Sequence, residues 1–171
     1  MAQFARPDSD VTLTNFDSPF WSNVDEVSPD DDTTSQRSGF GVAAGALYEL
    51  TLSNVTDPVS STGHVLRVRH LSSPTLVTGQ ILIELRQGAS TVIASATFDA
   101  PTSYTTFIIT LSGAEADSIT DYTDLRVRGT TQVTTNFRLL TTWIEFEVPD
   151  APGGLSIPIA MRHYMTLQEA S

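Results

Sequence analysis

The strongest constraint on this chain is a two-residue alternation of apolar and polar side chains. In residues 80–86, Ile81, Ile83 and Leu85 share one side of an extended segment, whereas Leu82, Glu84 and Arg86 face the other. Alternation with a period of two is typical of a β-strand that buries one face. The same rhythm predicts strands over residues 64–71, 105–111, 125–128 and 139–148.

Each predicted strand has an expected core face. We expect Leu66, Val68 and His70 to share one, and Phe107, Ile109 and Leu111 to share another. In the last strand, Leu140, Ile144, Phe146 and Val148 should line one face, with Trp143, Glu145 and Glu147 on the other. Weaker patterns predict strands over residues 11–16, 47–53 and 91–98, the last reached through a hairpin at residues 88–90.

A single helical segment is predicted. Ser112 and Glu115 have the Ser-x-x-Glu spacing of a capping box, which predicts a short helix over residues 113–119. About eight short strands with one helical turn are typical of an all-β fold, namely a two-sheet antiparallel β-sandwich or jelly roll.

Composition limits the partners. The sequence has 20 acidic and nine basic residues and a net charge of −11, which disfavours nucleic acid as a partner because such binding relies on basic side chains. All nine basic residues are arginine, which indicates either bidentate contacts at interfaces or the codon usage of a GC-rich genome. No apolar run approaches the roughly 20 residues that cross a bilayer, and no signal peptide is visible, so we expect no membrane partner and synthesis in a cytoplasm.

The two ends of the chain are predicted to be arms. We divide the sequence into an N-terminal arm (1–10), a sandwich (11–148), a linker (149–154) and a C-terminal arm (155–171). An arm this apolar is expected to lie on a partner or on its own domain, and Pro158 suits an extended edge. The residues expected to bind the partner are Leu155, Ile157, Ile159, Met161, Tyr164, Met165 and Leu167.

No constellation for catalysis, a cofactor or a metal is evident. The sequence has no cysteine and no Gly-x-Ser-x-Gly elbow, and its three histidines lack the spacing of zinc ligands. His70 is expected in the core or at its rim. Glu145 and Glu147 could act as acid and base, but cross-strand ion pairs with arginines are the favoured interpretation. Similarly, the run of aspartates at residues 30–32 is interpreted as a solvated loop rather than a calcium site.

One surface is a candidate for ligand binding. Trp21 and Trp143 could stack on sugars, and Trp143 is predicted to face away from the core. The possible ligand face comprises Trp143, Arg67, Arg69, Arg126 and Arg128. The alternative is that the long N-terminal segment covers Trp143.

Several blocks of the sequence resemble bacteriophage virion structural proteins with a jelly-roll, galactose-binding-like sandwich. The blocks are RPDSDV at 6–11, VDEVSPDD at 24–31, TGHVLRVR at 62–69, LSGAEADSITDYTDLRVR at 111–128 and WIEFEVP at 143–149. The resemblance extends over about residues 6–150, and the block AEADSITDYTDL is its most specific part. It implies a virion component with the sandwich already predicted from the alternation.

The function that we expect is that of a capsid decoration, or cement, protein. It would bind the outer surface of the major capsid protein lattice as a homo-oligomer, a trimer or a dimer, on the virion exterior. The alternative is a neck, tail or receptor-binding virion protein with a carbohydrate-binding sandwich. In neither case do we expect an enzyme.

Overall fold

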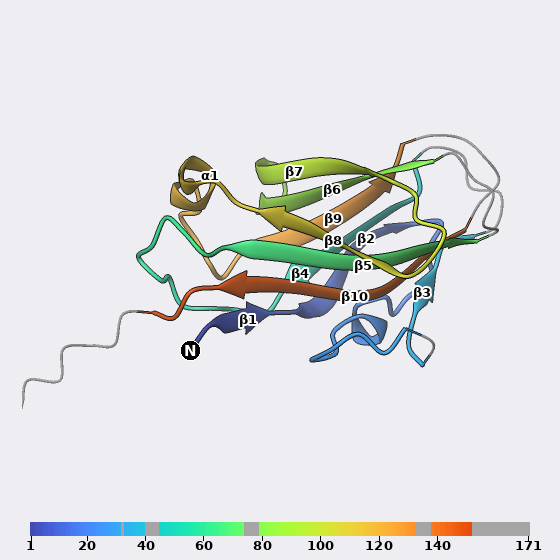
Figure 1. The fold of residues 1–171 in the computed structure, drawn as a ribbon, viewed down its shortest axis with the longest axis horizontal. Coiled ribbons are helices and arrows are strands. Elements are labelled where there is room, and N and C mark those ends of the chain that lie inside the picture. Colours follow the sequence, from blue (N-terminus) through green and yellow to red (C-terminus); the bar gives the residue numbers. More distant parts are fainter. Residues whose placement is uncertain (32, 40–44, 74–78, 133–137, 152–171) are drawn as a thin grey trace, which may run out of the picture.

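The computed structural model describes residues 1–31, 33–39, 45–73, 79–132 and 138–151. In these residues two antiparallel sheets pack face to face, with the apolar core between them (Figure 1). The predicted all-β sandwich is therefore confirmed. None of the helices in these segments is long and apolar enough to span a membrane.

Within the described segments, ten strands make up the two sheets. In chain order the elements are β1 (Gln3–Ala5), β2 (Pro7–Thr14), η1 (Trp21–Asn23), β3 (Gln36–Arg37), β4 (Leu47–Leu52), β5 (Val65–Ser73), β6 (Gln80–Gln87), β7 (Thr91–Asp99), β8 (Thr105–Thr110), α1 (Gly113–Asp117), β9 (Leu125–Thr131) and β10 (Arg138–Val148). The first sheet has the order β1-β10-β5-β8, with β3 also paired to β10. The second sheet has the order β2-β4-β9-β6-β7.

All eight predicted strands are present, and the alternation places most side chains as expected. Ile81, Ile83 and Leu85 are fully buried, and His70 is buried on the same face of β5 as Leu66. The hairpin predicted at residues 88–90 joins β6 to β7. The capping box is also present: the Ser112 hydroxyl accepts from the amide of Glu115, whose carboxylate accepts from the Ser112 amide at 2.7 Å.

The face assigned to β10 is wrong at its beginning. The pairing of β10 with β5 shifts between Thr141 and Trp143, which is a β-bulge. Because an extra residue reverses the side on which the preceding residues lie, Leu139 rather than Leu140 belongs to the core. Thr141 likewise faces inward, where its hydroxyl lies 3.1 Å from Nδ1 of His70.

The predicted N-terminal arm is also wrong, because residues 1–10 belong to the sandwich. Strand β1 pairs with β10, with Gln3 opposite Val148, and β2 pairs with β4 in the other sheet. Of the predicted linker, residues 149–151 follow β10 directly. The rest of the linker and the C-terminal arm, with all seven of its predicted partner-binding residues, lie outside the described residues.

An aromatic cluster fills the core near one end of the sandwich. The Tyr48 ring is fully buried, stacks on Phe20 at 4.7 Å between ring centroids, and meets Phe16 edge to face at 5.7 Å. Gly129 lies opposite Tyr48 on β9, and a Cβ atom there would lie 2.3 Å from Cζ of the tyrosine ring. The absence of a side chain at Gly129 thus makes room for the ring that supports Phe16.

Candidate functional site

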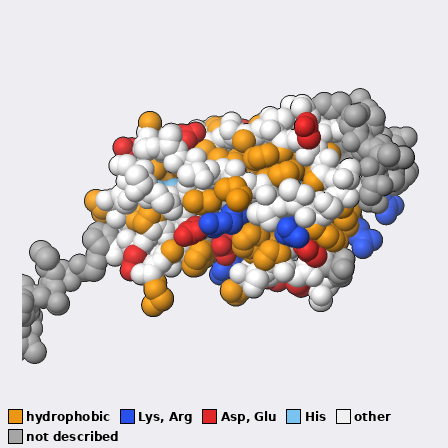
Figure 2. Space-filling model, in the orientation of Figure 1, with side chains coloured by type: hydrophobic (Ala, Val, Ile, Leu, Met, Phe, Trp, Pro, Cys, Tyr) orange, Lys and Arg blue, Asp and Glu red, His pale blue; other side chains and the backbone are white. Residues whose placement is uncertain are grey.

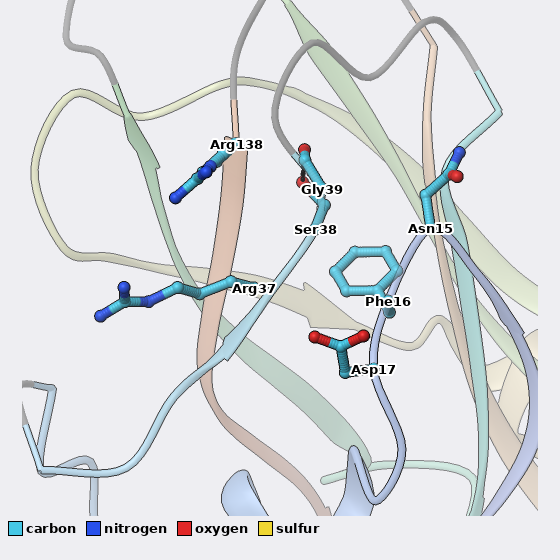
Figure 3. Close-up of a pocket in the computed structure, with 7 residues that line it drawn as sticks. All are labelled: Asn15, Phe16, Asp17, Arg37, Ser38, Gly39 and Arg138. Carbon is cyan, nitrogen blue, oxygen red and sulfur yellow. Dashed lines mark hydrogen bonds between the residues drawn. The ribbon is translucent and has the colours of Figure 1, made fainter.

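A pocket of about 360 Å³ opens at the end of the sandwich where β2 and β3 end and β10 begins (Figure 3). Its lining residues are Asn15, Phe16, Asp17, Arg37, Ser38, Gly39 and Arg138. The lining combines two guanidinium groups, a carboxylate, an amide and a hydroxyl with one aromatic ring. This volume falls in the range of small-molecule binding sites.

Three segments far apart in the sequence are joined by backbone hydrogen bonds to form the pocket. The amide of Gly39 donates to the carbonyl of Asn15 at 2.8 Å, and the amide of Ser38 donates to the carbonyl of Leu139 at 2.9 Å. The Ser38 hydroxyl accepts in return from the amide of Leu139 at 2.9 Å. Asn15 has φ = 62°, a left-handed conformation that asparagine tolerates better than most residues, where the chain leaves β2.

The ring of Phe16 is anchored in the core. It is 9% exposed and packs edge to face on Phe20 at 5.2 Å between centroids, in addition to Tyr48. Asp17 follows directly in the chain, so one residue supplies an apolar contact and the next a hydrogen-bond acceptor (Figure 3). At this exposure the ring belongs to the core and supports the wall of the pocket rather than presenting a face to a ligand.

The two arginines of the pocket lie on neighbouring strands. Arg37 of β3 is opposite Leu140 of β10, and Arg138 is two residues before Leu140. Positions two residues apart on a strand point to the same side of the sheet, so Arg37 and Arg138 are diagonal neighbours. Figure 3 shows both side chains extending in the same direction.

The predicted ligand face is not one face. Arg67 and Arg69 of β5 and Trp143 of β10 lie on the outer side of the first sheet, whereas Arg126 and Arg128 of β9 lie on the outer side of the second sheet. The prediction that all five act together is therefore wrong. A period-two pattern places a residue on a face of its own strand, but it does not say to which sheet that strand belongs.

Trp143 is not available as a stacking platform. It is 7% exposed, and its indole Nε1 donates to the backbone carbonyl of Glu26 at 2.9 Å. The amide of Ile144 donates to the carbonyl of Val24 at 3.0 Å in the same segment. The alternative interpretation, in which the N-terminal segment covers Trp143, is confirmed. Trp21 of η1 is half-buried and packs against the core.

Glu145 and Glu147 form the cross-strand ion pairs expected for them. Arg67 reaches Glu147 at 2.6 Å and Glu145 at 3.7 Å, and Arg6 reaches Glu145 at 2.5 Å. Figure 2 shows basic and acidic groups side by side on this outer face. Carboxylates held by arginines in this way favour a structural role over acid–base catalysis.

The acidic loop forms a separate ion pair on the same outer face. Both oxygens of Asp31 accept from Arg69, at 2.5 and 2.7 Å, and this hydrogen bond lowers the pKa of Asp31. The Asp30 carboxylate accepts from the amide and the hydroxyl of Thr34, and Asp32 lies outside the described residues. In the part of the chain that the structure describes, no three histidine, aspartate or glutamate side chains come together as metal ligands would.

Arg126 and Arg128 converge with Arg86 on Glu49, which is 2% exposed. Nε of Arg128 donates to Glu49 at 2.9 Å, and Arg126 lies 3.5 Å from the other carboxylate oxygen. One buried carboxylate therefore holds three guanidinium groups on β6 and β9 over the second sheet. Glu49 was not predicted as a site residue. The sequence nevertheless shows it as a charged residue at an outward position of an otherwise apolar strand.

The histidines lie in the core rather than in a reactive site. His70 is fully buried, and burial lowers its pKa to about 3. Nε2 of His64 lies 2.8 Å from the hydroxyl of Tyr122, and burial lowers the pKa of His64. The complete burial of His70 confirms the prediction that it is a core residue. His163 lies outside the described residues.

A second, smaller pocket of about 290 Å³ lies at the opposite end of the sandwich. It is lined by Asp57, Val59, Ser60, Ser61, Ala116, Asp117, Ile119 and Tyr122. Burial raises the pKa of Tyr122 to about 12, and the nearby Asp57 and Asp117 act in the same direction. The phenol thus stays protonated at neutral pH and is a poor candidate for proton transfer.

No family model matches the sequence, and no curated protein matches it. Among solved structures, a CBM4 module is 12% identical with a TM-score of 0.46, over 74% of this chain and 90% of that one. The family 30 carbohydrate-binding module of the cellulosomal cellulase Cel9D-Cel44B of Clostridium thermocellum is 9% identical with a TM-score of 0.43, over 88% and 92%. The enzymatically active domain of tailspike protein 4 of bacteriophage CBA120 is 12% identical with a TM-score of 0.40, over 85% of this chain and 19% of that one. At such identities and TM-scores these neighbours carry no argument about ancestry or ligand.

Proposed function

We propose that the protein is a binding module that recognises a carbohydrate through the end pocket lined by Phe16, Asp17 and Arg37. The observation that carries the proposal is the gathering of guanidinium, carboxylate and amide groups in one pocket of about 360 Å³. Sugars present pairs of hydroxyls to such planar hydrogen-bonding groups.

The module acts by binding rather than by hydrolysis. Among the described residues that line the pocket, Asp17 is the single carboxylate. Glycoside hydrolysis most often uses two carboxylates on opposite sides of the scissile bond. We therefore expect no release of reducing ends from any glycan that binds.

A glycan array with the full-length protein tests the proposal. The expected result is saturable binding to a defined set of glycans, lost in Asp17→Ala and kept in Asp99→Ala, which removes an exposed carboxylate from the edge strand β7. Both variants should unfold at the wild-type temperature. If no glycan binds, or if Asp17→Ala binds as the wild type does, the pocket is not a carbohydrate site.

A second candidate function is decoration of a phage capsid, with the major capsid protein as partner and the virion exterior as location. One structural observation favours it. Strand β10 begins at the pocket and ends beside β1, so the chain leaves the sandwich toward residues 152–171 at the end opposite the pocket. An anchor at that end would leave the pocket facing outward.

Copy number tests this second candidate. Hundreds of copies per particle by gel densitometry are expected for a decoration protein, and a dozen or fewer would indicate a neck or tail component. Deleting residues 155–171, or changing Ile157→Asp, should weaken attachment to undecorated heads while the sandwich stays folded. A truncated protein that still saturates the heads would contradict an anchoring role for this segment.

A further inference from the structure

We infer that Asp10 and Gln36 are positioning residues for the end pocket, because their side chains hold the loop that carries Asp17. The inference rests on the proposed carbohydrate site and adds two residues on which its affinity depends. Neither Asp10 nor Gln36 is among the described residues that line the pocket, so neither is expected to touch the saccharide. Both act through residues 17–21, where the chain passes from β2 into η1.

Asp10 of β2 accepts hydrogen bonds from the part of this segment that follows Asp17. Its Oδ1 accepts from the amide of Trp21 at 2.9 Å, and its Oδ2 accepts from the amide of Phe20 at 3.0 Å and from the Ser18 hydroxyl at 2.8 Å. Both carboxylate oxygens are therefore used by this one segment. A carboxylate suits the position, because it accepts several hydrogen bonds and has no N–H group that would oppose the amides.

Gln36 of β3 binds the backbone carbonyls of the same segment. Its side-chain Nε2 donates to the carbonyl of Asp17 and, at 3.1 Å, to the carbonyl of Pro19. Gln36 is 9% exposed, so water competes little for these two carbonyls. The next residue in the chain, Arg37, lines the pocket, so the short strand β3 supplies one side chain to the pocket and one to the loop that carries Asp17.

The position of Asp17 is therefore fixed by its own backbone and by the residues on either side of it. Gln36 fixes the carbonyl of Asp17, and Asp10 fixes the residues that follow. Phe20, whose amide donates to Asp10, also packs edge to face on Phe16. A saccharide that binds the carboxylate of Asp17 does not have to order this loop. Such preorganisation raises affinity, because less of the contact energy is offset by lost conformational freedom.

Affinity measurements on full-length variants test the inference, with the saccharide that binds most tightly on the glycan array as the probe. Asp10→Asn keeps the size of the side chain but turns one acceptor into an N–H donor. Gln36→Met keeps its length but removes the N–H groups that donate to the loop. In calorimetric titrations we expect each variant to bind about tenfold more weakly than the wild type. The amide resonances of Asp17 and Ser18 should shift in the free variants, before any saccharide is added.

Asp8→Asn is the matched control and should keep the wild-type affinity. It makes the same chemical change on β2, where the carboxylate of Asp8 accepts from the Thr51 hydroxyl of β4 instead of from the loop. Wild-type affinity in Asp10→Asn or in Gln36→Met, or an equal loss in Asp8→Asn, overturns the inference while the carbohydrate site stands. Weaker binding with an unshifted amide resonance of Asp17 also overturns it. Absence of saccharide binding in the wild-type protein overturns both the inference and the proposed site.

Discussion

Glu49 is the residue on which the outer face of the second sheet depends most. It is 2% exposed and is the shared partner of three arginines, so replacing it by glutamine leaves their charges close together without compensation. Removing one partner of a buried ion pair costs about 3 kcal/mol or more. We expect Glu49→Gln to lower the free energy of unfolding by about that amount in urea titrations.

Glu84→Gln provides the matched control for Glu49. Glu84 is half-buried on the neighbouring strand β6 and has no ion-pair partner among the residues with described side chains. Its replacement should change the free energy of unfolding by less than about 0.5 kcal/mol. Similar losses of unfolding free energy in the two variants would show that the ion pairs around Glu49 stabilise the fold no more than Glu84 does.

His70 makes the stability of the fold depend on pH. Its pKa is about 3 in the folded protein and about 6.5 when unfolded, so below pH 6.5 the unfolded chain binds a proton that the folded one does not. The free energy of unfolding should therefore fall by up to about 1.4 kcal/mol per pH unit as pH decreases. The lowered pKa of His64 acts in the same direction.

Urea unfolding between pH 6.5 and 5 isolates the histidine contribution, because carboxylates titrate mainly below this range. In His70→Gln the slope against pH should be shallower, leaving the part that His64 contributes. A slope identical to that of the wild type would contradict the assignment of His70 as a buried neutral group.

At the scale of elements, the alternation predicts the long strands and misses the short ones. Strands β6 and β8 bury one apolar face more completely than the other, so their period is clear in the sequence. Strands β1 and β3 have three and two residues, too few to show a period, and they exist because β10 offers them an edge. Pairing of this kind is a long-range property that local patterns do not contain.

The end pocket could not be predicted for the same reason. Arg37 lies on the two-residue strand β3, and its neighbour Arg138 is about 100 positions away in the chain, so only the pairing of β3 with β10 brings them together. By contrast, the sequence did single out Trp143, whose strand is clear, but the segment that covers it carries no periodic signal. A signal that could have been used is Asn15-Phe16-Asp17, an aromatic residue between two polar ones at the end of a predicted strand.

The capping box of α1 is an element-scale feature that the sequence predicts correctly. Ser112→Ala removes the hydroxyl that accepts from the Glu115 amide and should cost about 1 kcal/mol, because an amide of the first turn loses its partner. Thermal unfolding measures this loss. Ser103→Ala, in an exposed loop, serves as control, and an equal effect of both changes would argue against a stabilising cap.

At the scale of the whole molecule, the sandwich has two functionally different ends. The pocket lies where β10 begins, and the chain continues toward residues 152–171 from where β10 ends (Figure 1). Because the pocket and the end of β10 lie at opposite ends of the sandwich, we expect glycan binding and attachment through residues 155–171 to be independent. Deleting residues 155–171 should leave glycan affinity unchanged in calorimetric titrations, and a marked loss of affinity would show that this segment contributes to the glycan site.

The most direct test of carbohydrate recognition at the end pocket is to map a bound saccharide by NMR. Titration with a saccharide selected on the glycan array should shift the backbone amides of Asp17, Arg37, Ser38 and Gly39 while those of β5 and β9 stay in place. Shifts confined to the outer faces around Arg67 or Arg128, with the pocket amides unmoved, would contradict the proposed site.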